Sequence, residues 1–104
     1  MALQSGVLMP TQGNPTRVSV NASANSATTA LPSRLVVITS DSDVFVQFGP
    51  STLSATAATT SSFPIWAKSY LTFDLGKLDG SVGYINIFNN GGSAAVVTMF
   101  ALGV

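Results

Sequence analysis

Residues 34–49 read RLVVITSDSDVFVQFG and contain two short apolar segments separated by a polar turn. The segments, 34–39 and 44–48, are rich in the β-branched and aromatic side chains that are typical of strands. Between them, Ser40–Asp43 carries short oxygen-bearing side chains that bind backbone amides in turns. Gly49–Pro50 then ends the second segment, because proline cannot donate to a strand ladder. We therefore predict a β-hairpin in this stretch.

Strand-like patterns recur along the rest of the chain. Residues 17–23 alternate between apolar and polar side chains, and residues 70–74 form another short strand-like run. We predict a second hairpin from 82–88 and 94–102, because Asn89–Gly92 supplies residues that accept positive φ angles. About six to eight short strands with turns between them predict an all-β fold, either an antiparallel β-sandwich or a jelly-roll-like barrel.

We expect one β domain over residues 17–104, preceded by an extended amino-terminal arm over residues 1–16. The arm contains three consecutive apolar residues without an evident local partner, Val7, Leu8 and Met9. They are predicted to lie across a neighbouring subunit, and the alternative is a frayed terminus. The first residues lack the features of a secretory signal, and no apolar run reaches the length of a membrane span.

Residues 51–62 consist almost entirely of serine, threonine and alanine. This composition predicts a long surface loop, with one weak edge strand around residues 55–59 as an option.

Charge is scarce in this sequence, with four basic and four acidic residues among 104 and a net charge of zero. Globular proteins usually carry about 25% charged residues, and a chain with so few is poorly protected against self-association. We therefore expect a homo-oligomer. The basic residues are scattered, which argues against nucleic-acid binding. The last predicted strand is apolar on both faces, and its residues Val97, Met99 and Leu102 are predicted to form an interface with another subunit.

The sequence lacks the usual groups of catalytic sites. It contains no histidine and no cysteine, and neither lysine follows a serine at the Ser-x-x-Lys spacing. The acidic residues fall at predicted turns or strand ends, where aspartate caps backbone amides; they are Asp41, Asp43, Asp74 and Asp79. Asp41 and Asp43 alone are a weak calcium signal. We expect no enzymatic activity, no bound metal and no cofactor.

Aromatic side chains leave one binding function open. Trp66 and Tyr70 are candidates for a glycan platform if they are exposed, and core packing is the simpler alternative. Asn21-Ala22-Ser23 matches a glycosylation acceptor, which we attribute to coincidence.

Four sequence elements occur in a characteristic order. They are Leu31–Pro32, the element VFVQFG at 44–49, Pro64–Ile65, and a closing glycine-looped segment over residues 84–102. With these elements, residues 18–104 resemble a group of short virion-associated proteins of tailed bacteriophages. The chain departs from their pattern at Trp66-Ala67-Lys68, where the group tends to place a glycine soon after the Pro-Ile step.

The resemblance implies a non-enzymatic structural protein of the phage particle. The expected function is that of a capsid decoration, or cement, protein, made in the host cytoplasm and bound on the particle surface. Its expected partners are the major capsid protein or other virion proteins, and its expected oligomer is a trimer, with no nucleic-acid or membrane partner. The resemblance thus makes the capsid an alternative to a second subunit as the partner of the predicted interface residues, which are Val7, Leu8, Met9, Val97, Met99 and Leu102. The alternatives are a tail adaptor, baseplate or fibre-associated subunit, and a carbohydrate-binding module centred on Trp66.

Overall fold

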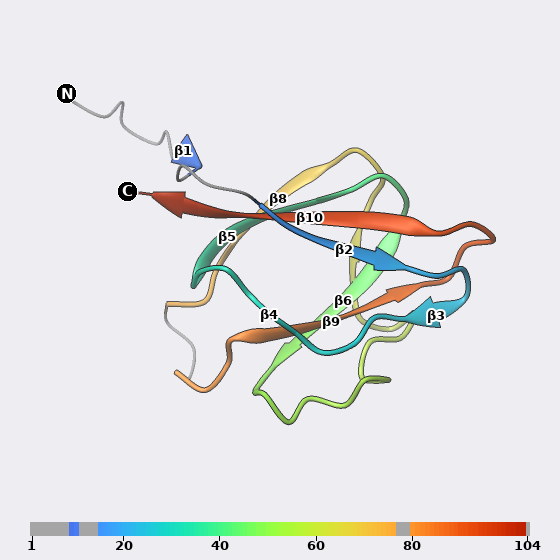
Figure 1. Ribbon diagram of the computed structural model, residues 1–104, viewed down its shortest axis with the longest axis horizontal. Helices are drawn as coiled ribbons and strands as arrows, with labels where there is room; N and C mark the ends of the chain where they lie inside the picture. The colour runs from blue at the N-terminus through green and yellow to red at the C-terminus, as the bar shows by residue number, and fades with distance from the viewer. Residues whose placement is uncertain (1–8, 11–14, 77–79, 104) are drawn as a thin grey trace.

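The computed structural model describes residues 9–10, 15–76 and 80–103. Within these ranges the chain forms ten β-strands and no helix, which confirms the predicted all-β class (Figure 1). The strands are β1 (Met9–Pro10), β2 (Thr16–Val20), β3 (Ala24–Asn25), β4 (Thr29–Ala30), β5 (Leu35–Ser40), β6 (Val44–Gly49), β7 (Phe63–Ile65), β8 (Tyr70–Asp74), β9 (Tyr84–Asn89) and β10 (Ala95–Gly103).

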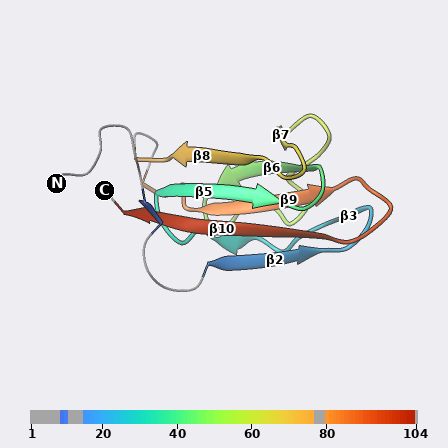
Figure 2. The same cartoon turned by 90° about the horizontal axis from the view of Figure 1, so that it is seen from above.

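The strands form two antiparallel sheets that pack as a sandwich. In the first sheet, β10 pairs with β1 and β2 on one side and with β5 on the other, and β5 pairs with β8. Figure 2 shows β8, β5, β10 and β2 side by side in this order. The second sheet repeats the plan, with β3 and β4 beside β9, then β6, then β7.

The connectivity is that of a jelly roll. The strands pair from the outside of the sequence inward: β2 with β10, β3 and β4 with β9, β5 with β8, and β6 with β7. Such nested pairing across two sheets is the jelly-roll arrangement of eight strands, if β3 and β4 are counted as one interrupted strand and β1 is set aside.

Both predicted hairpins are wrong. β5 and β6, which contain the two apolar segments of residues 34–49, lie in different sheets, and so do β9 and β10. Residues 41–43 and 90–94 form the short connections that were expected near these positions, but each carries the chain from one sheet to the other. The reason is that β5 buries its apolar side chains against those of β6 across the core, so their backbones pair with strands remote in sequence.

The core lies between the sheets and follows the alternation of side chains along each strand. In β5, Val36 and Ile38 are fully buried, whereas Leu35 and Val37 on the other face are half-buried. The core cluster is Val20, Val36, Ile38, Val44, Val46, Ile65, Ile85, Ile87, Ala95, Val97 and Met99.

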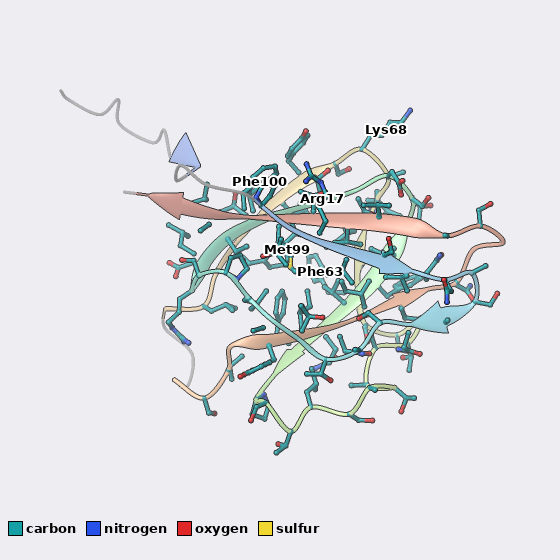
Figure 3. The ribbon with its side chains drawn as sticks, in the orientation of Figure 1. Arg17, Phe63, Lys68, Met99 and Phe100 are labelled. Atoms are coloured by element: carbon teal, nitrogen blue, oxygen red, sulfur yellow. The ribbon has the colours of Figure 1, made fainter. Side chains whose placement is uncertain are left out.

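Val97 and Met99 were predicted at an oligomer or capsid interface, and the structure corrects this. Both have no exposed surface, and Figure 3 shows Met99 between the two sheets. Leu102 is buried as well, with 9% of its surface exposed, although it lies outside the core cluster. The large apolar residues of β10 that remain partly exposed are Val96 and Phe100.

The arm has a contact within its own chain. Met9–Pro10 pairs with Leu102–Gly103, so Figure 1 shows β1 beside the end of β10. The premise that this segment has no local partner is therefore wrong for the backbone of these two residues. The predicted contacts of Val7 and Leu8 lie outside the described residues.

Residues 51–62 form a loop of successive turns without the optional edge strand (Figure 1, yellow-green). The loop is fastened at several points. The Thr28 hydroxyl donates to the Leu53 carbonyl at 2.6 Å, and the Leu53 side chain lies so close to Gly49 that a Cβ there would be 2.7 Å from its Cδ1 atom. Glycine at position 49 thus makes room for Leu53.

Candidate functional site

The outer face of the first sheet is one candidate surface. It consists of the residues that alternate with the buried ones on three strands: Val96, Thr98 and Phe100 of β10, Leu35, Val37 and Thr39 of β5, and Tyr70, Thr72 and Asp74 of β8. Phe100 lies opposite Val37, and Val37 lies opposite Thr72, so these residues form continuous cross-strand rows. We call this set the outer face of the first sheet.

This face is apolar at its centre and charged only at its margins. Leu35, Val37 and Phe100 are half-buried, and Val96 is 36% exposed. Arg17 of β2 lies opposite Thr98 at one margin, and Asp74 lies on β8 at the other. Figure 3 shows Arg17 and Phe100 on the side of β10 away from Met99. An apolar centre with a polar rim is the composition of protein–protein interfaces.

The outer face of the second sheet is partly covered by the chain itself. Asn86 of β9 is fully buried, and its side-chain oxygen accepts hydrogen bonds from the Asn25 side chain and the Ala58 backbone amide, both at 2.9 Å. Its amide group donates to the Ser26 carbonyl at 2.7 Å and the Ala55 carbonyl at 3.1 Å. Since Ala58 is only 1% exposed, the loop of residues 51–62 lies against this sheet and removes part of it from solvent.

Trp66 lines an open depression of about 390 Å³ at the end of the sandwich. Three segments contribute to it, with the residues Ser42, Asp43, Phe45, Trp66, Asn89, Asn90, Gly91, Gly92 and Ser93. Trp66 is 55% exposed, so it is not the core residue of the simpler alternative.

Tyr70 lines a different depression. This second hollow has a volume of about 330 Å³ and extends the outer face of the first sheet toward Lys68 and Asp41. Tyr70 is 70% exposed. Both aromatic residues of the predicted glycan platform are thus on the surface, but the structure separates them into two depressions.

The turn between β7 and β8 contains Trp66, Ala67 and Lys68. Lys68 has a φ angle of 63°, in the left-handed region that favours glycine. Its backbone amide donates to the Ser40 carbonyl at 2.8 Å, and the Ser69 amide donates to the Trp66 carbonyl at 3.1 Å. The chain therefore builds a glycine-type turn with a lysine, which projects beside the second depression.

Three of the four aspartates bind backbone amides at turns, as predicted. Asp41 accepts from Val96 at 2.9 Å, Asp43 from Ala67 at 2.7 Å, and Asp74 from Gly76 at 2.9 Å. Asp79 lies outside the described residues. Among the residues that the structure describes, no three acidic, histidine or cysteine side chains gather as a metal-binding group.

Sequence reasoning missed the two buried asparagines. Asn89 has no exposed surface, and its amide nitrogen lies within hydrogen-bonding distance of the Val20, Asn21 and Ser93 carbonyls, at 3.1, 3.3 and 2.8 Å. Its oxygen accepts from the Gly91 amide at 2.9 Å. The signal was available in the segment YINIFN at 84–89, where two amides interrupt an apolar strand and have to find partners if they are buried.

These surfaces have to be interpreted from their own chemistry. No helix in the described ranges is long and apolar enough to cross a membrane. Comparison with protein-family models, with curated proteins and with solved structures finds no match for this chain.

Proposed function

We propose that this chain is a non-enzymatic structural protein of a phage particle, a capsid decoration protein that assembles with copies of itself and attaches to the major capsid protein. The observation that carries the proposal is the outer face of the first sheet, which combines an apolar centre with charges confined to its margins. A second copy of the chain is the occupant that this face fits best, and a trimer is the favoured oligomer.

Charge supports a second copy as the occupant. Arg17 and Asp74 flank the apolar centre at opposite margins, so a neighbouring copy can place its carboxylate near the guanidinium of the first. Such an interface needs to bring together only one charged pair, Arg17 of one copy and Asp74 of the other. The apolar residues between these margins supply most of the free energy of association. The neutral net charge adds no long-range repulsion between copies.

The jelly-roll fold is compatible with this function but does not identify it. Jelly rolls are common in viral capsid proteins and in lectins. A fold hosts many functions, so the proposal depends on the surface and uses the fold only as an analogy. A tail adaptor, baseplate or fibre-associated subunit would need the same kind of surface, and the number of copies per particle separates these alternatives.

The self-association is tested by sedimentation of the purified chain. Val37→Asp places a carboxylate at the centre of the outer face, and we expect the wild-type oligomer to become a folded monomer. Leu102 is unsuitable for this test because it is buried and its substitution would damage the fold.

The matched control is Gln47→Asp, which adds the same charge to an exposed strand position of the second sheet. It is expected to sediment like the wild type, and circular dichroism checks that both variants fold. A monomeric wild type, or a Val37→Asp variant that remains oligomeric, would contradict the proposed interface.

A further inference from the structure

The depression beside Trp66 is a candidate ligand-binding site, because it combines an exposed indole with polar groups in a concave surface. Trp66 keeps 55% of its surface exposed. The depression has a volume of about 390 Å³, within the range of small-molecule sites. It lies at the loop end of the sandwich and shares none of the nine residues that define the outer face of the first sheet.

The walls of the depression are fixed before any ligand binds. Asp43 holds the Ala67 amide at 2.7 Å, which ties the segment that carries Trp66 to the turn between β5 and β6. On the opposite wall, Asn89 binds the Gly91 amide at 2.9 Å and the Ser93 carbonyl at 2.8 Å. A pre-formed site of this kind loses little conformational entropy on binding.

The chemistry of the lining favours a neutral polyhydroxylated ligand. The flat indole offers an apolar surface to the C–H face of a sugar ring, and Ser42, Asn90 and Ser93 offer hydroxyl and amide groups to its hydroxyls. Asp43 is the only charged residue among the lining residues that the structure describes. Its carboxylate accepts hydroxyl hydrogen bonds but repels carboxylate and phosphate groups.

We propose that this depression binds a neutral saccharide, with Trp66 stacking on the sugar ring and Asp43 and Asn90 bonding its hydroxyl groups. Binding of a surface glycan would be a function in addition to the proposed assembly. It is independent of the outer face of the first sheet, so either proposal can fail without the other.

The chain provides its own reporter, since Trp66 is its single tryptophan. We would titrate the protein with glucose, galactose, mannose, N-acetylglucosamine and short oligomers of each, and record tryptophan fluorescence. Glucuronic acid is the anionic control. We expect a saturable change with at least one neutral sugar series and none with glucuronic acid. No saturable change with any neutral saccharide would overturn the proposal, and so would stronger binding of glucuronic acid.

Variants then locate the site by calorimetry with the best saccharide. Trp66→Ala is expected to weaken binding about tenfold, the loss of one stacking contact. Tyr70→Ala is the matched control, because Tyr70 is an exposed aromatic residue in the other depression, and it should bind as the wild type does. Unchanged affinity in Trp66→Ala, or an equal loss in Tyr70→Ala, would refute the site. Both residues are mainly exposed, and a thermal unfolding scan verifies that each variant is folded.

Discussion

Replacing Asn86 by alanine tests what holds the loop of residues 51–62 against the second sheet. The substitution removes a fully buried amide that makes four hydrogen bonds. Two of the lost partners are backbone groups of buried residues, the Ala58 N–H group and the Ser26 carbonyl. The Ala55 carbonyl belongs to an exposed residue and can turn to water.

The expected loss follows from the two orphaned groups. A buried polar group left without a partner costs about 1–3 kcal/mol, so two of them cost roughly 2–6 kcal/mol. The loop of residues 51–62 can detach and expose the Ala58 amide to water, which keeps the loss in the lower part of this range. We therefore expect Asn86→Ala to lower the free energy of unfolding by about 2–4 kcal/mol, and the Tm by about 10 °C or more.

Urea unfolding measures the total effect, and amide hydrogen exchange locates it. In Asn86→Ala, exchange at Ala58 should accelerate more than exchange at core positions of β5. The control is Gln47→Ala, since Gln47 is the exposed cross-strand neighbour of Asn86 and should cost no more than about 0.5 kcal/mol. A loss below about 1 kcal/mol in Asn86→Ala, or continued protection of the Ala58 amide, would refute the role assigned to this side chain.

Three further predictions follow from the described contacts. Met99→Ala should lower the free energy of unfolding by about 2–5 kcal/mol, because Met99 is fully buried in the core; a variant with normal thermal stability that only fails to oligomerise would show that Met99 is an interface residue after all. Lys68→Gly should raise stability by up to about 1 kcal/mol, since glycine relieves the positive φ angle of 63°; a lower urea midpoint would contradict this. A chelator should leave the Tm unchanged, because Asp41 and Asp43 bind backbone amides, and a decrease of several degrees would reveal a structural metal ion.

The sequence predicted the positions of the strands better than the way in which the strands pair. Alternation and turn residues located β5, β6, β9 and β10 to within a few residues. The same signals suit a hairpin and a crossing between two sheets, because both need a short turn between two strands that each bury one face. What separates them is the pairing of β5 with β8 and β10, which involves residues far apart in the chain.

The surfaces were harder to predict for a related reason. β10 is apolar on both faces, and periodicity alone does not say which face meets the core. Val97 and Met99 were assigned to an interface, whereas the structure buries them and leaves Val96 and Phe100 partly exposed. Trp66 was recognised as a candidate, but the walls around it come from segments that only the fold brings together.

A cryo-electron microscopy map of the phage particle that we propose contains this chain tests the central claim most directly. The account predicts jelly-roll oligomers distributed over the head shell, with the outer face of the first sheet buried between copies in each oligomer. Density confined to the tail, or oligomers on the shell in which Val37 and Phe100 face solvent, would contradict it.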